Sequence, residues 1–295
     1  MEGYHSTVLL NEVIDALEIQ DAWYLDCTLG DGGHSLEIIK KGGKVIGVDQ
    51  DPQALERVRK RFEQEGIDKS KFKLILGNFR DLENLIKQRD TDEFKVNGVI
   101  FDLGVSSLQL ESSERGFSFM KDGPLDMRMD PTLGVRALDL INTGGRKELY
   151  ELFKNLGEEK YSWTLANSIV SARQVMPITT TRQLVAVIEQ SARGRRGEIH
   201  PATRVFQALR IAVNDELGAI EEGLDQVVKL VEKNGRIIVI SFHSLEDRIV
   251  KNKFKSWEKE GLGQILTKKP QMASESELNA NPKSRSAKMR IFKKL

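Results

Sequence analysis

Short apolar runs alternate with amphipathic stretches over the first hundred residues of the chain. Four of these runs read as buried strands: Trp23–Leu29, Lys44–Gln50, Phe72–Leu76 and Val96–Leu103. The segments between them carry apolar residues at helical spacing. We expect helices there, at Ser35–Lys41, Pro52–Glu65 and Asp81–Arg89. Alternation of this kind predicts βαβ units and a parallel sheet.

The alternation stops after about residue 110. Glu111–Pro131 is rich in Gly, Asp and Met and has no clear period. Helical patterns follow, and this part of the sequence contains no convincing strand pattern. The helices that we expect here are Lys147–Asn155, Glu159–Arg173, Thr181–Ser191 and Pro201–Val213.

Strand patterns return in the last third. An expected helix, Glu216–Lys233, leads to a buried strand at Arg236–Phe242, and two weaker strand candidates follow at Gln264–Lys268 and Lys288–Lys293. The simplest fold class is α/β, a Rossmann-like sheet interrupted by a helical domain. We therefore expect a discontinuous sheet domain at 1–109 and 214–295, with an inserted helical domain at 110–213.

Composition limits the class of protein. Hydrophobic residues make up 39% and charged residues 30%, as in ordinary globular proteins. No apolar run approaches the roughly 20 residues that cross a bilayer, and Met1–Leu10 lacks the apolar core of a signal peptide. Cys27 is the only cysteine, so neither a disulfide within the chain nor a multi-cysteine zinc site can form. These features predict a cytoplasmic protein. No residue is predicted to bind a metal ion.

Charge is unevenly distributed although the net charge is only +1. The segment Arg173–Arg210 holds seven arginines against Glu189 and Glu198, and the chain from Lys251 onward holds twelve Lys or Arg and four Glu. Solvated helix faces would give such runs. Two basic regions on a nearly neutral chain also fit a phosphate-rich partner.

A glycine-rich turn, Asp26–Ser35, follows the first expected strand. Glycines at a strand-to-helix turn let the backbone approach a ligand closely. Asp49 ends the second expected strand, where an acid can accept hydrogen bonds from both ribose hydroxyls of a nucleoside. The turn and this acid together predict a cofactor that contains adenosine.

Two cofactors compete for this site. The dinucleotide pattern places a small residue where this chain has Ser35, and Asp31 within the turn would repel a pyrophosphate. S-adenosylmethionine has no phosphate, and its sulfonium and ammonium groups tolerate acids such as Asp26. The turn therefore favours S-adenosyl-L-methionine over NAD, and an NAD-dependent oxidoreductase is the alternative function.

Further candidates leave the carboxyl ends of other strands, which is the edge where open α/β sheets bind ligands. Phe79 follows the third strand and could pack on adenine or simply belong to the core. Asp102 ends the fourth strand and is the candidate catalytic residue, with a helix cap as its structural alternative. His243 follows the fifth strand and is either a site residue or a structural histidine.

With these motifs in place, the chain resembles the bacterial 16S rRNA cytosine-N4 methyltransferase family, RsmH or MraW. The resemblance covers essentially the whole chain. It implies a seven-stranded methyltransferase sheet, an inserted helical recognition domain, and methylation of one cytidine in the decoding region of 16S rRNA. The matching stretches are His5–Leu10, Asp26–Ser35, Asp102–Gln109, Arg115–Asp130, Arg204–Asn214, Ile240–Arg248 and Asn281–Arg290.

The resemblance also implies site residues and partners. The partner is 16S rRNA, within the small ribosomal subunit, with no membrane; oligomeric state is left open, a homodimer being one option. The implied cofactor contacts are Gly32, Gly33, His34, Asp49, Phe79, Asp102 and Gln109, and the candidate substrate-binding residues are Ser106, Ser107, Arg128 and His243.

The sequence departs from the family pattern at two places. Leu108 stands where relatives often have proline, and Lys160–Asn167 is less rich in arginine than the corresponding helix. The second departure questions the RNA contacts of that helix and leaves the chemistry untouched.

The atom that is methylated can be argued from the residues. Methylation at cytosine C5 uses a cysteine thiolate, and Cys27 lies in the cofactor turn instead of on the catalytic strand. An exocyclic amine needs positioning and polarisation, and Asp102 could accept its hydrogen bond. The aromatic that stacks the base is left open among Phe117, Phe119 and Phe242. A non-catalytic RNA-binding or assembly factor is a second alternative, disfavoured by intact Asp49 and Asp102.

Overall fold

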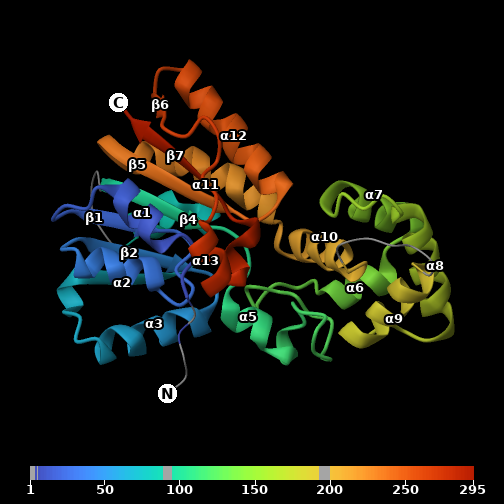
Figure 1. The fold of residues 1–295 in the computed structure, drawn as a ribbon. Coiled ribbons are helices and arrows are strands. Elements are labelled where there is room, and N and C mark those ends of the chain that lie inside the picture. Colours follow the sequence, from blue (N-terminus) through green and yellow to red (C-terminus); the bar gives the residue numbers. More distant parts are fainter. Residues whose placement is uncertain (1–3, 5, 89–94, 193–199) are drawn as a thin grey trace. The chain divides into compact units, whose positions relative to one another are not determined.

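The computed structural model describes residues 4, 6–88, 95–192 and 200–295. The chain divides into two compact units (Figure 1). Unit 1 comprises 1–104 and 217–295, and unit 2 comprises 105–216. The predicted insert at 110–213 therefore lies inside unit 2, whose borders are a few residues wider.

Unit 1 contains one seven-stranded sheet in the order β3-β2-β1-β4-β5-β7-β6. The first five strands of the chain pair in parallel, and β7 runs antiparallel to both β5 and β6. This is the seven-stranded α/β sheet that the family resemblance implies. The strands are β1 (Trp23–Asp26), β2 (Lys44–Asp49), β3 (Phe72–Leu76), β4 (Val96–Asp102), β5 (Val231–Ser241), β6 (Gly263–Ile265) and β7 (Lys288–Lys294).

Strand β5 begins earlier than the sequence pattern indicates. Val231 pairs with Val96, and after an irregularity in register Arg236 pairs with Gly98. The polar residues between them hide this extension, because they break the apolar run from which the strand was predicted.

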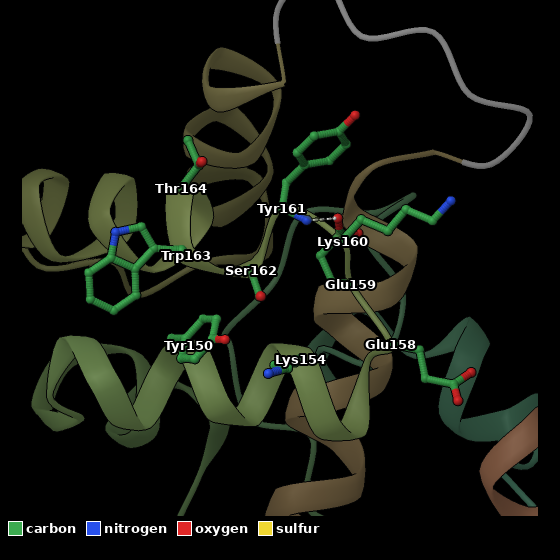
Figure 2. A pocket seen from close by; sticks show the side chains of 9 residues that line it. All are labelled: Tyr150, Lys154, Glu158, Glu159, Lys160, Tyr161, Ser162, Trp163 and Thr164. Carbon is green, nitrogen blue, oxygen red and sulfur yellow. Dashed lines mark hydrogen bonds between the residues drawn. The ribbon is translucent and has the colours of Figure 1, made fainter.

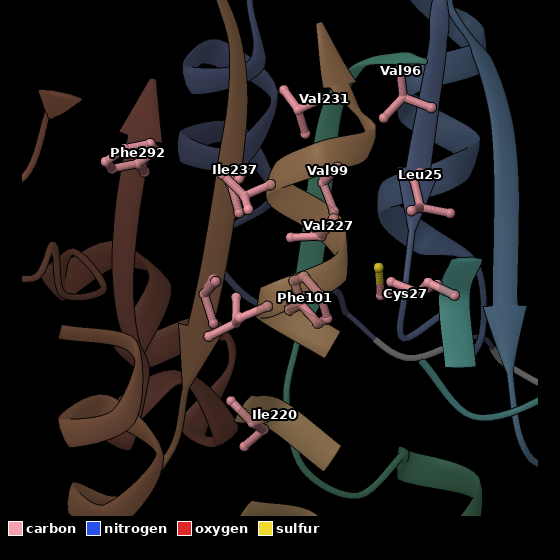
Figure 3. Close-up of a cluster of buried hydrophobic side chains, with 14 of the residues drawn as sticks. Leu25, Cys27, Val96, Val99, Phe101, Ile220, Val227, Val231, Ile237 and Phe292 are labelled. Atoms are coloured by element: carbon pink, nitrogen blue, oxygen red, sulfur yellow. The ribbon is translucent and has the colours of Figure 1, made fainter. Parts of the chain in front are cut away.

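Helices cover both faces of the sheet, and the alternation of side chains along the strands explains why. In β5, Ile237 and Val239 join one apolar cluster, while Ile238 and Ile240 join another on the opposite face. The helices that pack on the first cluster, part of which Figure 3 shows, are α4 (Leu82–Lys87), α11 (Glu216–Leu230) and α12 (Ser244–Lys259). Those on the second are α1 (Leu10–Leu17), α2 (Gly33–Lys40) and α3 (Pro52–Gln64).

Local signals set where some of these helices begin. Helix α3 starts at Pro52, where a missing N–H costs nothing, and the Asp51 carboxylate accepts a hydrogen bond from Gln53 N–H at 3.0 Å. The remaining short helices of unit 1 are α13 (Glu275–Ala280) and the 3₁₀ turns η1 (Lys69–Lys71), η2 (Phe79–Asp81) and η4 (Pro282–Ser286).

Unit 2 is helical and has its own apolar core. Phe153, Ile169 and Leu209 are fully buried within it. No strand forms in the part of unit 2 that the structure describes. Its helices are α5 (Ser107–Glu111), α6 (Ala137–Thr143), α7 (Arg146–Leu156), α8 (Ser162–Val175), α9 (Thr181–Ser191) and α10 (Ala202–Asn214), with the 3₁₀ turn η3 (Ser113–Arg115).

The helices are also too short or too polar for a bilayer. Within the described ranges, none combines the length and the apolar composition needed to span a membrane.

Candidate active site

Two polar side chains meet at the carboxyl ends of β1 and β4. His34 begins the first turn of α2 after the glycine turn, and its Nε2 lies 3.7 Å from Oδ2 of Asp102. Among the described residues, both ring nitrogens of His34 and Oδ1 of Asp102 are buried without a hydrogen-bond partner. Buried polar groups normally have partners, so this pair of side chains is suited to receive a ligand.

The backbone holds Asp102 in place. Its N–H donates to Oγ1 of Thr28 at 2.6 Å, which ties the end of β4 to the glycine turn. Thr28 is not among the residues predicted for the site from the sequence. Its place in the glycine-rich turn, two residues after the end of β1, is the sequence feature that could have indicated its role.

Asp49 lies at the end of β2, beside the same turn. Its Oδ2 accepts a hydrogen bond from Gly30 N–H, and its Oδ1 accepts one from Asp51 N–H, both at 2.9 Å. Burial raises the pKa of Asp49 to about 6, and the two backbone N–H groups only partly oppose this. Each carboxylate oxygen keeps a further lone pair for a ligand hydroxyl.

The glycine turn is tightly packed. Gly32 has φ of +70°, a conformation that other residues rarely adopt. A Cβ on Gly33 would lie 1.8 Å from Oγ1 of Thr7, so the turn and the N-terminal segment fit together only if this position has no side chain.

Two acids of the turn differ in their surroundings. Asp26 is buried, and its Oδ2 accepts a hydrogen bond from Ser35 Oγ at 2.6 Å. Burial raises the pKa of Asp26, and the Ser35 hydrogen bond opposes that effect. Asp31 instead pairs with Arg57 of α3 at 3.0 Å. Its charge is thus compensated, which weakens the sequence argument that Asp31 excludes a phosphate.

Phe79, in η2 after β3, is partly buried. Its ring packs edge-on against Phe101 with centroids 5.4 Å apart, and it contacts the position of Gly223 in α11. The ring therefore belongs to the edge of the core. Its predicted contact with adenine stays a prediction.

Cys27 follows the last residue of β1 and is buried in the first apolar cluster (Figure 3). Burial raises the pKa of its thiol well above the ordinary value, and nearby Asp26 adds to that effect. The thiol is therefore protonated at neutral pH and poorly suited to attack a base.

Several candidate residues have structural partners of their own. In unit 2, Ser106 and Gln109 form a capping box at the start of α5, in which Ser106 Oγ accepts from Gln109 N–H and Gln109 Oε1 accepts from Ser106 N–H. Ser107 is the first residue of the same helix. Cofactor binding by Gln109 and substrate binding by Ser106 and Ser107 stay predictions. The side chains of Ser106 and Gln109 also stabilise the start of α5.

His243 and Arg128 are engaged in the same way. In unit 1, His243 caps α12, with Nδ1 accepting from Glu246 N–H at 3.4 Å and Nε2 lying 3.1 Å from Glu246 Oε1. In unit 2, the Arg128 guanidinium forms two 2.8 Å hydrogen bonds to Asp126 and donates to the carbonyls of Pro131 and Leu133. These partners favour structural roles, and substrate binding by either residue stays a prediction.

Some residues named in the sequence analysis lie outside the described residues. They include Met1, His5, Arg89 and, within the basic segment, Arg193, Arg195, Arg196 and Glu198.

Comparison with known proteins addresses the chain as a whole. Residues 2–295 match the model of a family described as the MraW methylase family. The chain belongs to that family. The match covers the sheet, the glycine turn and the insert together, and a methylase family excludes the oxidoreductase alternative.

Named relatives are similar over their full length. Proteins called ribosomal RNA small subunit methyltransferase H are 44% identical in Clostridium botulinum, with all of both chains covered. The protein of that name in Carboxydothermus hydrogenoformans is also 44% identical, over the whole of this chain and 99% of its own.

Solved structures are more distant. An rRNA methylase from Streptococcus thermophilus has 11% identity and a TM-score of 0.44, covering 97% of this chain and 93% of its own. The 16S rRNA N2 G1207 methyltransferase of Thermus thermophilus, in complex with AdoMet and guanosine, has 11% identity and a TM-score of 0.43, covering 100% of this chain and 44% of its own. Likenesses at this level do not bear on function.

Proposed function

We propose that this methylase transfers a methyl group from S-adenosyl-L-methionine to N4 of one cytidine in the decoding region of 16S rRNA. The substrate is the RNA within the small ribosomal subunit, and the reaction takes place in the cytoplasm. The observation that carries the proposal is the 44% identity, over the full length of both chains, to a ribosomal RNA small subunit methyltransferase H.

The residues at the sheet edge fit the methyl donor. Asp49 offers two carboxylate oxygens to the ribose hydroxyls. A Cβ on Gly30 of the glycine turn would meet only the Thr28 carbonyl, at 3.9 Å, so the backbone is open to a ligand at that position. The unpartnered atoms of His34 and Asp102 supply polar groups nearby. When bound, the donor supplies an electrophilic methyl group on a positively charged sulfur.

Asp102 orients the nucleophile in this proposal. The exocyclic amine of cytosine is a weak nucleophile, because its lone pair is delocalised into the ring. Oδ1 of Asp102 accepts a hydrogen bond from the amine, which fixes the direction of the nitrogen lone pair and stabilises the positive charge that develops on it. Once the methyl group is on nitrogen, that hydrogen leaves as a proton through the carboxylate to water, which gives the neutral N4-methylated base. His34, 3.7 Å from the other carboxylate oxygen, limits how that carboxylate can turn.

Cys27 supports an amine target over a ring carbon. Attack on the ring at C6, which C5 methylation requires, needs a thiolate. The only thiol of the chain is buried, and its pKa is raised. The base must also leave its stack to reach the sheet edge.

Mass spectrometry of nucleosides from small-subunit RNA tests the proposal. Cells that lack the gene should lose an N4-methylated cytidine, and the purified protein should restore it on isolated small subunits. A chain that restores a methylated guanosine or a 5-methylcytidine instead would refute the N4 assignment.

A further inference from the structure

A pocket of about 390 Å³ opens on unit 2, where the end of α7 meets the start of α8 (Figure 2). That volume lies within the roughly 300–1,000 Å³ of sites for small molecules. The pocket uses none of the residues assigned to methyl transfer. Its lining residues are Tyr150, Lys154, Glu158, Glu159, Lys160, Tyr161, Ser162, Trp163 and Thr164.

One side of the pocket is aromatic. Trp163 is 50% exposed, and its ring packs edge-on against Tyr150, with centroids 5.4 Å apart and planes at 80°. This contact fixes the indole while leaving much of it open to solvent. A rigid, exposed aromatic side chain is a platform on which a nucleobase can stack.

The other side attracts an anion. Helix α8 is 14 residues long, no side chain caps its N-terminus, and its first turn contains no acid. Free backbone N–H groups and the helix dipole therefore favour a negative charge there. The Lys154 ammonium, held near the Tyr150 ring at 5.3 Å, adds a full positive charge.

Ser162 provides an independent indication of a ligand. Its side chain is buried, with the residue only 3% exposed, and its hydroxyl makes no hydrogen bond among the residues that the structure describes. Figure 2 shows Oγ directed into the pocket, toward Lys154 and Tyr150. The hydroxyl can therefore donate a hydrogen bond to a group in the pocket, and a phosphate oxygen at this position would accept it.

Two acids also line the pocket. The Glu159 carboxylate accepts a hydrogen bond from Tyr161 N–H at 2.8 Å. Glu158 projects away from Trp163 and Lys154 in Figure 2. Lys154 lies beside Ser162 and Tyr150 in Figure 2, whereas Lys160 extends away from Trp163, so Lys154 supplies the positive charge of the pocket.

We propose that this pocket binds one nucleotide of the ribosomal RNA outside the methylation site, with the base stacked on Trp163 and a phosphate at Ser162, Lys154 and the N-terminus of α8. The proposal rests on the proposed function only for the identity of the RNA. The segment Lys160–Asn167, which has few arginines, would then bind RNA by aromatic stacking on Trp163.

Fluorescence anisotropy with the full chain and a labelled single-stranded RNA about ten nucleotides long tests the pocket. Trp163→Ala should bind roughly 5- to 150-fold more weakly, the range for losing one stacked base, whereas Trp163→Phe should retain most affinity. Val175→Ala, 90% exposed on the same helix and outside the pocket, is the matched control. Circular dichroism confirms that each variant is folded.

Salt dependence tests the phosphate contact. Lys154→Gln should lower the slope of log affinity against log salt by about 0.7, the value for one phosphate of a single strand. Lys147→Gln, exposed on the same helix and outside the lining, should change it less. Photocrosslinking with 4-thiouridine should label the peptide that contains Trp163.

Methylation of small subunits separates this proposal from the proposed function. Trp163→Ala should raise KM for subunits and leave kcat unchanged. Oligonucleotide affinity and KM both equal to wild type would overturn the pocket proposal, as would a raised KM with unchanged RNA affinity, which would indicate a protein partner. If the wild-type chain methylates no ribosomal RNA but Trp163-dependent RNA binding persists, the proposed function fails and the pocket stands.

Discussion

At the scale of single residues, the most informative feature is a set of carboxylates whose surroundings differ. Asp49 is held by two backbone N–H groups yet has a raised pKa, and Asp102 has an oxygen with no partner among the described residues. Asp31, by contrast, is neutralised by Arg57. Asp49 and Asp102 have no such cationic partner in the described parts of the chain, so a ligand that donates hydrogen bonds to them would stabilise their charge.

Cofactor affinity should depend on pH through Asp49. Only the ionised carboxylate accepts two hydroxyl hydrogens, so binding should be constant at neutral pH and weaken as the pH falls through about 6, approaching tenfold per pH unit. Binding lowers the pKa and releases protons near that pH. Calorimetry with S-adenosylmethionine across this range measures both effects. Asp49→Asn should bind weakly, by roughly 1.5–3 kcal/mol per lost charge-assisted bond, with a flat profile; a flat wild-type profile would contradict the assignment.

Asp102 should matter for turnover more than for folding. Asp102→Ala removes the acceptor for the amine hydrogen, and we expect roughly a 10²- to 10⁴-fold loss in single-turnover rate at saturating cofactor and RNA. Asp21→Ala, on the exposed surface of unit 1, is the control. Near-normal single-turnover rates in Asp102→Ala would remove this residue from catalysis.

Cys27→Ala should remain active. The thiol is buried and its pKa is raised, so it plays no part in attack on the base. The loss of a small buried side chain should lower stability by about 1 kcal/mol. Rates of methyl transfer and the melting temperature measure the two effects, and an inactive but folded variant would reopen the C5 mechanism.

At the scale of elements, the sequence identified all seven strands, because buried strands leave apolar runs of the right length. It missed helices α1, α5, α6, α12 and α13. His243, which the sequence assigns to the site, caps α12, and its predicted role in substrate binding stays a prediction. The signal for that cap was Glu246 three residues later. Ion pairs such as Asp31–Arg57 depend on contacts between α3 and the turn, which no local pattern reveals.

The cofactor turn should not tolerate a side chain at Gly33. In Gly33→Ala the new Cβ would collide with Oγ1 of Thr7, so we expect a loss of roughly 1–3 kcal/mol in the free energy of unfolding. Denaturant titration measures it. Gly134→Ala, where a Cβ meets nothing within 4 Å, is the matched control. Equal stability of the two variants would mean that the N-terminal segment moves aside at little cost.

At the scale of the whole molecule, each unit has a core of its own. Two apolar clusters belong to unit 1, one on each face of its sheet, and the third belongs to unit 2. Separate cores are the mark of units that can fold separately. The loss of strand patterns after residue 110 predicts a division close to these borders, and an inserted domain that recognises the substrate stays a prediction.

Replacing Val105–Glu216 with a Gly/Ser linker should therefore leave a folded unit 1. We expect it to bind S-adenosylmethionine, more weakly if Gln109 contributes as the family resemblance implies, and to lose methylation of small subunits. Calorimetry and methyl-transfer assays measure the two properties. A deletion variant that still modified the same cytidine at a comparable rate would disprove a recognition role for the insert.

The order of strands in the sheet also has a consequence for biosynthesis. Strand β4 pairs with β5, so Gly98 has no strand partner until Arg236 has been made. Strand β7 follows all the others in the sequence and lies between β5 and β6. During translation, β4 keeps an unpaired edge while the whole of unit 2 is synthesised. Unit 2 can fold on the nascent chain, whereas the sheet closes only after β7 has been made. A ribosome that stalls between β4 and β7 would thus hold a nascent chain with an open, aggregation-prone edge.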